Sequence, residues 1–181
     1  MGKEYVWYVC YGSNMLRERF EIYLKGGYCK YNGQTYVEHC TDPTPPTDVK
    51  PYKIQHHNMY YGNQSERWGG RSVSFLDSDI SKDGFAWGRA YRITEEQFED
   101  IWKLEGKGKN WYHYKLELPS FRDGEKVYTF TNEDADARKK EFSDVSEAYQ
   151  TVIKLGLKET YPEMTEQAIK EYIEKTIQNS Q

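Results

Sequence analysis

The sequence predicts a mixed α+β fold in which a small, barrel-like mixed sheet is flanked by helices. An apolar strand followed by a helix opens the chain, strand-like segments fill its middle, and two amphipathic helices close it. Strands that are grouped in this way, rather than alternating with helices, are typical of α+β architecture. The length of 181 residues and the lack of internal repeats predict one domain over residues 1–181.

The first strand is expected at residues 4–10, which are apolar, β-branched and aromatic almost without a break. The loop that follows leads into a helix expected over 15–24, for which Asn14 has the side chain of a good N-cap. Gly26 and Gly27 then end this helix, because glycine readily leaves the helical conformation.

The middle of the chain is expected to begin with an irregular segment and then to form strands. Residues 28–51 contain four prolines and several tyrosines, which predicts an atypical Pro/Tyr-rich loop. Farther along, short runs rich in β-branched and aromatic residues lie between turn residues, as in half-buried strands. These strands are expected at residues 52–61, 72–76, 85–93, 112–118 and 125–131.

Three further helices are indicated by capping residues and apolar periodicity. Thr94 and Gln97 form the pattern of a capping box, and the helix that they begin is expected to end at Glu105, before Gly106. Apolar stripes at helical spacing predict two more helices, over 146–158 and 165–178. We interpret these two stripes as core packing rather than as parts of a cofactor site.

Composition excludes several functional classes. The net charge of −4 argues against nucleic acid as a partner, because non-specific binding to phosphates needs a basic face. No apolar stretch is long enough for a signal peptide or a membrane span, so we expect no membrane partner. The three cysteines match no common zinc spacing, so we predict no metal site, and free thiols fit a cytoplasmic location.

The loop after the first strand is the first candidate site. Tyr11-Gly12-Ser13-Asn14 stands where a strand turns into a helix, so several backbone N–H groups are free to bind a carboxylate, a phosphate or an oxyanion. Gly12 allows a tight turn and a close approach of a ligand. A plain strand-to-helix turn, capped by Asn14, accounts for the same local pattern.

Glu105 is the second candidate. Together with Phe98, Ile101 and Trp102 it lies at the spacing i, i+3, i+4 and i+7, which places this acid at the end of the stripe that faces the core. A carboxyl group partly withdrawn from water suits proton transfer near neutral pH. A frayed helix end, with the carboxylate in solvent, is the alternative.

These features, taken in order, resemble the gamma-glutamyl cyclotransferase-like proteins. The run from Tyr8 to Met15 resembles the Y-G-S-N loop of that family, and Leu104-Glu105-Gly106 matches its acidic residue and glycine. The other matching segments are Trp68–Val73, Phe85–Tyr91, the aromatic Tyr112, Ala148-Tyr149 and Gly156–Glu159. The stretch 21–51 departs from the family by its length and composition, in a region that shapes the pocket for the leaving group.

The resemblance implies a cofactor-independent intramolecular acyl transfer on a small gamma-glutamyl substrate. The α-amine of the glutamyl group attacks its own γ-carbonyl, which gives 5-oxoproline and a free amine or amino acid. It also implies that Glu105 is the general acid/base and that the backbone from Tyr11 to Asn14 holds the substrate and the oxyanion. The remaining substrate-binding residues that it implies are Tyr8, Val9, Cys10 and Tyr112, with Ser13 not taking part in the chemistry.

Two alternatives remain open at this level. A non-catalytic ligand-binding module of the same fold would keep the loop but would need no proton-transfer group at Glu105. A sugar-processing domain is suggested by the aromatic content, but it requires two carboxylates that face each other across a cleft, and the sequence identifies no such pair.

Overall fold

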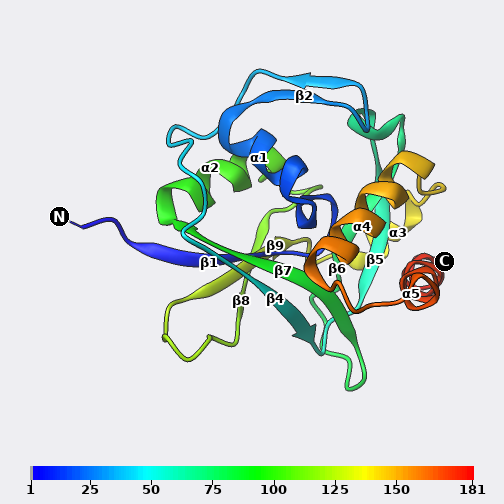
Figure 1. Ribbon diagram of the computed structural model, residues 1–181. Helices are drawn as coiled ribbons and strands as arrows, with labels where there is room; N and C mark the ends of the chain where they lie inside the picture. Colours follow the sequence, from blue (N-terminus) through cyan, green and yellow to red (C-terminus); the bar gives the residue numbers. More distant parts are fainter. Residues whose placement is uncertain (1) are drawn as a thin grey trace.

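A five-stranded mixed sheet forms the centre of the computed structural model, which describes residues 2–181 (Figure 1). The strand order is β4-β7-β1-β9-β8. All neighbours are antiparallel except β1 and β9, which are parallel. The strand bounds are β4 Asp48–Gln55, β7 Phe85–Thr94, β1 Tyr5–Cys10, β9 Val127–Thr131 and β8 Tyr114–Leu118.

A second strand pair, β5 (Met59–Ser65) with β6 (Arg71–Leu76), forms a sheet of its own and contacts β9. The Thr131 hydroxyl at the end of β9 donates to the Leu76 carbonyl and accepts from the Leu76 N–H. An isolated parallel bridge between Asp77 and Asn132 extends the same contact. The mixed sheet with flanking helices is as predicted, but the strands described make an open five-stranded sheet and a separate hairpin rather than a barrel.

Helices cover the sheet in two groups (Figure 1). The helix α2 (Glu95–Glu105) packs on β1 and β7, and α1 (Arg17–Lys25) packs on α2. The helices α3 (Ala135–Lys140) and α5 (Glu166–Gln178) pack on β5, while α4 (Glu147–Thr160) packs on α5 and β7. Short 3-10 turns lie at η1 (Ser13–Met15) and η2 (Glu66–Trp68). Within residues 2–181 no helix is both long and apolar enough to cross a membrane.

The core is built from the residues that the periodicities indicated. The capping box is present, since the Thr94 side chain accepts from the Gln97 N–H and the Gln97 side chain accepts from the Thr94 N–H. The stripe of α4 is buried at Tyr149, Val152 and Ile153. The end of α2 at Glu105 is confirmed, although Gly106 adopts φ 113° and ψ 103° rather than a left-handed helical turn.

The predicted cap at Asn14 is wrong. The helix α1 begins at Arg17, its N-cap is Leu16, and no side chain caps it. Asn14 lies in the middle of η1, where its Nδ2 donates to the buried Tyr8 hydroxyl and to the half-buried Glu105 carboxylate, and its Oδ1 accepts from no N–H group of the helix. These two bonds, one of them to a charged group, hold the carboxamide away from the start of α1.

The segment 28–51 is more regular than predicted. It contains most of a small hairpin, β2 (Gly27–Cys29) with β3 (Gln34–Tyr36), and also the first half of β4. Pro51 is tolerated in β4 because this strand is at the edge of the sheet, where no neighbour needs its missing N–H. The strand predicted at 52–61 is two strands, because the chain turns at His56, whose φ is 68°.

Candidate functional site

The loop from Tyr11 to Asn14 is held against the β5–β6 hairpin and α4. Gly12 lies so close to Ser74 of β6 that a Cβ atom would clash with the Ser74 Oγ and would lie 3.1 Å from the Tyr149 hydroxyl. Its φ of −114° is ordinary, so close packing rather than backbone conformation demands glycine here. The Tyr91 hydroxyl donates to the Asn14 carbonyl at 2.8 Å, which anchors the far end of the loop.

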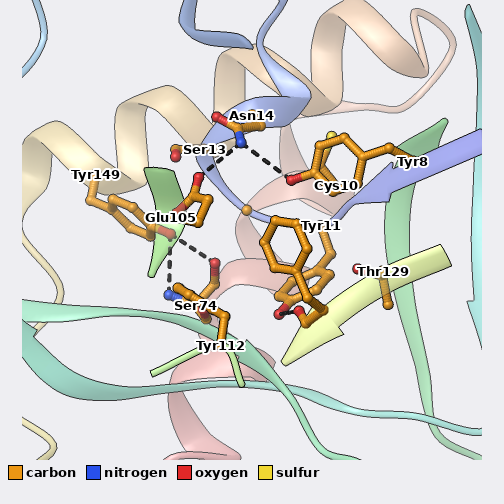
Figure 2. A pocket seen from close by; sticks show the side chains of 12 residues that line it. Tyr8, Cys10, Tyr11, Ser13, Asn14, Ser74, Glu105, Tyr112, Thr129 and Tyr149 are labelled. Atoms are coloured by element: carbon orange, nitrogen blue, oxygen red, sulfur yellow. Dashed lines mark hydrogen bonds between the residues drawn. The ribbon is translucent and has the colours of Figure 1, made fainter. Parts of the chain in front are cut away.

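Glu105 projects from the end of α2 toward this loop (Figure 2). Asn14 Nδ2 donates to Glu105 Oε1 at 2.9 Å and to the Tyr8 hydroxyl at 3.2 Å. The carboxylate is half-buried, while Asn14 is only 3% exposed. The helix end is thus not frayed into solvent, and one carboxamide joins the loop, the first strand and the acidic residue.

These groups line a small cavity of about 40 Å³. Every sequence-predicted site residue except Val9 lines it. The full lining is Tyr8, Cys10, Tyr11, Gly12, Ser13, Asn14, Ser74, Glu105, Tyr112, Thr129, Phe130 and Tyr149. Val9 lies on the other face of β1, against Gly88, because successive strand residues point to opposite sides.

Four lining residues were not predicted as part of the site. Tyr149 was assigned to core packing, and in the structure its hydroxyl contacts Ser74 Oγ at 2.7 Å and accepts from the Ser74 N–H. Thr129 and Phe130 come from β9, which is parallel to β1. No local pattern marks these residues, since strand pairing and helix packing alone bring them to the loop.

Two polar atoms in the cavity wall lack partners. Asn14 Oδ1 and Thr129 Oγ1 are both buried, and neither forms a hydrogen bond with residues 2–181. Buried polar atoms in native proteins are nearly always paired with protein or with water, so two unpaired atoms on residues that line one cavity favour a polar occupant. A ligand with a donor group and a second polar group meets this requirement.

The other ionisable groups of the cavity are held in their neutral forms. Burial raises the pKa of Tyr8, Tyr11 and Tyr112 well above the usual value, so these hydroxyls stay protonated. Burial likewise raises the pKa of the Cys10 thiol, which donates to the Arg89 carbonyl. The cavity wall therefore contains a single carboxylate, that of Glu105, and does not provide the acid pair of a glycosidase.

A larger cavity of about 380 Å³ adjoins the first. Ser13, Glu105, Tyr112 and Tyr149 line both cavities, so the carboxylate stands at the boundary between them. The charged residues of the larger cavity are Arg19, Glu66, Arg67 and Glu105. Residues 2–181 contain no group of three or more His, Cys, Asp or Glu side chains that could hold a metal ion.

Comparison with known sequences gives one partial relative. No protein-family profile matches the chain. Histone deacetylase 5 of Arabidopsis thaliana is 31% identical over 106 residues, which are 58% of this chain but 16% of that plant protein. The shared stretch is thus a small part of the plant protein, and the name of that protein refers to a much longer chain.

Comparison with solved structures identifies the fold. An uncharacterized human protein (loc79017) matches with a TM-score of 0.60 at 15% identity, over 94% of this chain and 88% of that one. A gamma-glutamyl cyclotransferase matches with a TM-score of 0.59 at 14% identity, over 94% and 87%. YkqA of Bacillus subtilis matches with a TM-score of 0.60 at 16% identity, over 96% of this chain and 55% of its own.

Proposed function

The chain has the fold of the gamma-glutamyl cyclotransferases, and we propose that it catalyses the corresponding reaction on a gamma-glutamyl amine or amino acid. The α-amine of the glutamyl group attacks its γ-carbonyl carbon. A new C–N bond closes a five-membered ring, the original amide C–N bond breaks, and 5-oxoproline and a free amine leave. Ring closure within one molecule has a high effective molarity, so the protein has mainly to orient the chain and transfer protons.

Glu105 is the proton-transfer group in this proposal. It accepts a proton from the attacking ammonium and returns one to the departing nitrogen, so the carboxylate is regenerated after each turnover. Its location at the boundary between the small and the large cavity supports this role. The amide that breaks would lie at this boundary, with the glutamyl part on one side and the leaving group on the other.

The loop is proposed to stabilise the oxyanion of the tetrahedral intermediate. The backbone N–H groups of Gly12, Ser13 and Asn14 form no hydrogen bond with residues 2–181, whereas that of Met15 donates to the Gly12 carbonyl. Free N–H groups on residues that line a cavity can act as pre-organised donors for developing negative charge. Asn14 Oδ1 and Thr129 Oγ1 would then pair with polar groups of the glutamyl moiety.

The observation that carries the proposal is the Asn14–Glu105 hydrogen bond inside the cavity. It fixes a half-buried carboxylate beside the loop's free donors. A non-catalytic binding module needs only the loop and has no use for a carboxylate held in this way.

A panel of gamma-glutamyl amines and amino acids tests the proposal, with 5-oxoproline as the measured product. We expect turnover of at least one compound and a fall in kcat of roughly 100- to 10,000-fold in Glu105→Gln, the usual range for general acid–base catalysis. Glu96→Gln on the same helix is the matched control, since Glu96 is exposed and lines neither cavity. Equal rates for Glu105→Gln and wild type would exclude the assigned role, and binding without turnover would favour the binding module.

A further inference from the structure

Arg19 is a buried cation whose guanidinium is only partly satisfied. The residue is 1% exposed on α1, and its Nη2 donates to the hydroxyls of Tyr23 and Tyr36, each at 3.1 Å. Its Nε and Nη1 are buried and form no hydrogen bond with residues 2–181. The guanidinium carbon lies 4.6 Å from the centroids of both tyrosine rings, so the group is held between two aromatic faces.

No carboxylate pairs with this cation in the part of the chain that the structure describes. Glutamates pair with Arg17, Arg89 and Arg92, but no ion pair includes Arg19 or Arg67. Withdrawing a guanidinium from water is unfavourable, as it is for any buried ion, unless an anion compensates its charge. Cation–π contacts with two tyrosines offset only part of this desolvation cost.

Arg67 reinforces the positive charge at the same place. It is exposed on η2, its Nη1 donates at 3.4 Å to the Tyr23 hydroxyl and to the Leu104 carbonyl, and its guanidinium lies 5.2 Å from the Tyr36 ring. Arg19 and Arg67 therefore contact the same two tyrosines, and both line the larger cavity next to Glu105. The exposed Glu66 lines that cavity as well.

We propose that Arg19 and Arg67 bind a carboxylate on the leaving group of the substrate. This inference rests on the proposed function, which puts the glutamyl moiety in the small cavity and the leaving group in the large one. A guanidinium offers parallel N–H donors that match the two oxygens of a carboxylate. The preferred substrates are therefore gamma-glutamyl amino acids or peptides, rather than gamma-glutamyl amines that lack an acidic group.

The hairpin of β2 and β3 contributes a residue to the proposed carboxylate site. Its last residue, Tyr36, supplies one of the two rings and one of the two hydroxyls that hold Arg19. A smaller cavity of about 170 Å³, lined by Tyr23, Tyr36 and Arg67 among others, continues outward along this hairpin. The segment that departs most from the usual family pattern thus helps to select the substrate.

Gamma-glutamylalanine and gamma-glutamylethylamine test the proposal directly, because they differ only in the carboxylate of the leaving group. For the wild type we expect kcat/KM to be about 10- to 100-fold higher for the alanine compound, the range of a hydrogen bond to a charged group. Arg67→Gln should lose about tenfold or more of this preference, because kcat/KM falls more for the alanine compound than for the ethylamine compound. Arg122→Gln, an exposed arginine that lines neither this cavity nor its neighbours, should keep the preference.

Arg19→Gln should abolish the preference more completely, since Arg19 is the buried member of the pair. Circular dichroism and a denaturant titration must accompany this variant, because an unfolded protein would lose both substrates together. Arg67 is exposed, so its variant keeps the test decisive even if Arg19→Gln does not fold. Two results would overturn the proposal while leaving the proposed reaction intact. One is equal turnover of the two compounds by wild type. The other is a preference for the alanine compound that survives both Arg67→Gln and a folded Arg19→Gln.

Binding measured by calorimetry distinguishes a failure of the proposed reaction from a failure of the proposed carboxylate site. If wild type releases 5-oxoproline from no compound of the panel, the proposed function is wrong. Tighter binding of the alanine compound that depends on Arg67 would still support the carboxylate site. If there is no turnover and the two compounds bind with equal affinity, the carboxylate site is rejected as well.

Discussion

Asn14 has a different role in the structure from the one that its type and position in the sequence suggest. Its type and position suggest a helix cap, and this prediction is wrong. Its carboxamide instead donates to Glu105 and Tyr8, while its Oδ1 is buried and has no partner among residues 2–181. The two candidates named from the sequence, the loop and Glu105, are joined by this residue, and a pairing between positions 14 and 105 leaves no local trace in the sequence.

Replacing Asn14 by alanine should reduce catalysis more than stability. The change removes the donor that orients Glu105, so we expect kcat to fall about 10- to 100-fold, as for loss of a hydrogen bond to a charged group. Steady-state 5-oxoproline formation and denaturant unfolding measure the two effects. Asn179→Ala, which removes a single bond to the Met59 carbonyl beyond α5, controls for a general effect of truncating asparagine. A normal kcat in Asn14→Ala would show that Glu105 needs no positioning.

Among the elements, those that depend on local signals were predicted well. The capping box of α2 and the buried stripes of α4 and α5 lie where periodicity and cap residues indicated. The strands within 28–51 were not predicted, and that of β4 forms by pairing with the distant strand β7. Pro51 lies opposite Arg89 in the ladder of β4 and β7, and a proline is compatible with a strand only when that strand proves to be an edge.

Close packing between the loop and β6 gives a prediction at the scale of elements. Gly12→Ala inserts a methyl group against Ser74 Oγ and should destabilise the protein by about 1–3 kcal/mol, the usual range for overpacking. The double variant Gly12→Ala/Ser74→Ala removes the nearest clashing atom, so part of the loss should return. Urea unfolding of both single variants and of the double variant gives the coupling energy. Strictly additive losses would mean that the strain lies elsewhere.

At the scale of the whole molecule, the site depends on chain segments that only the fold unites. Residues of β1, η1, β6, α2, β9 and α4 meet around one cavity, and the parallel pairing of β1 with β9 brings the Thr129 region to the loop (Figure 2). The sequence indicated the α+β class and most of the strands. It did not indicate that the sheet stays open, nor that Tyr149 and Ser74 would complete the wall.

Tyrosine burial makes the whole fold sensitive to alkali. The chain has 17 tyrosines, and burial raises the pKa of many of them, including Tyr8, Tyr11 and Tyr112 around the cavity. Burial also raises the pKa of Tyr52 and Tyr161 to about 12. An acid whose pKa is higher in the folded state binds its proton more tightly there. Its contribution to stability is therefore fully present below the unfolded value of about 10 and is lost as the pH rises above it.

Alkaline titration should therefore show two classes of tyrosine. We expect a first class to ionise reversibly near pH 10, about the value of a tyrosine side chain in water, with the fold unchanged. The buried tyrosines should ionise only at higher pH and together, as the protein unfolds, because each phenolate formed in the interior is uncompensated. Tyrosinate absorbance and far-ultraviolet circular dichroism, recorded on the same samples, measure both events. Ionisation of all tyrosines in one step near pH 10, with circular dichroism unaltered, would contradict the buried environment assigned to the cavity tyrosines.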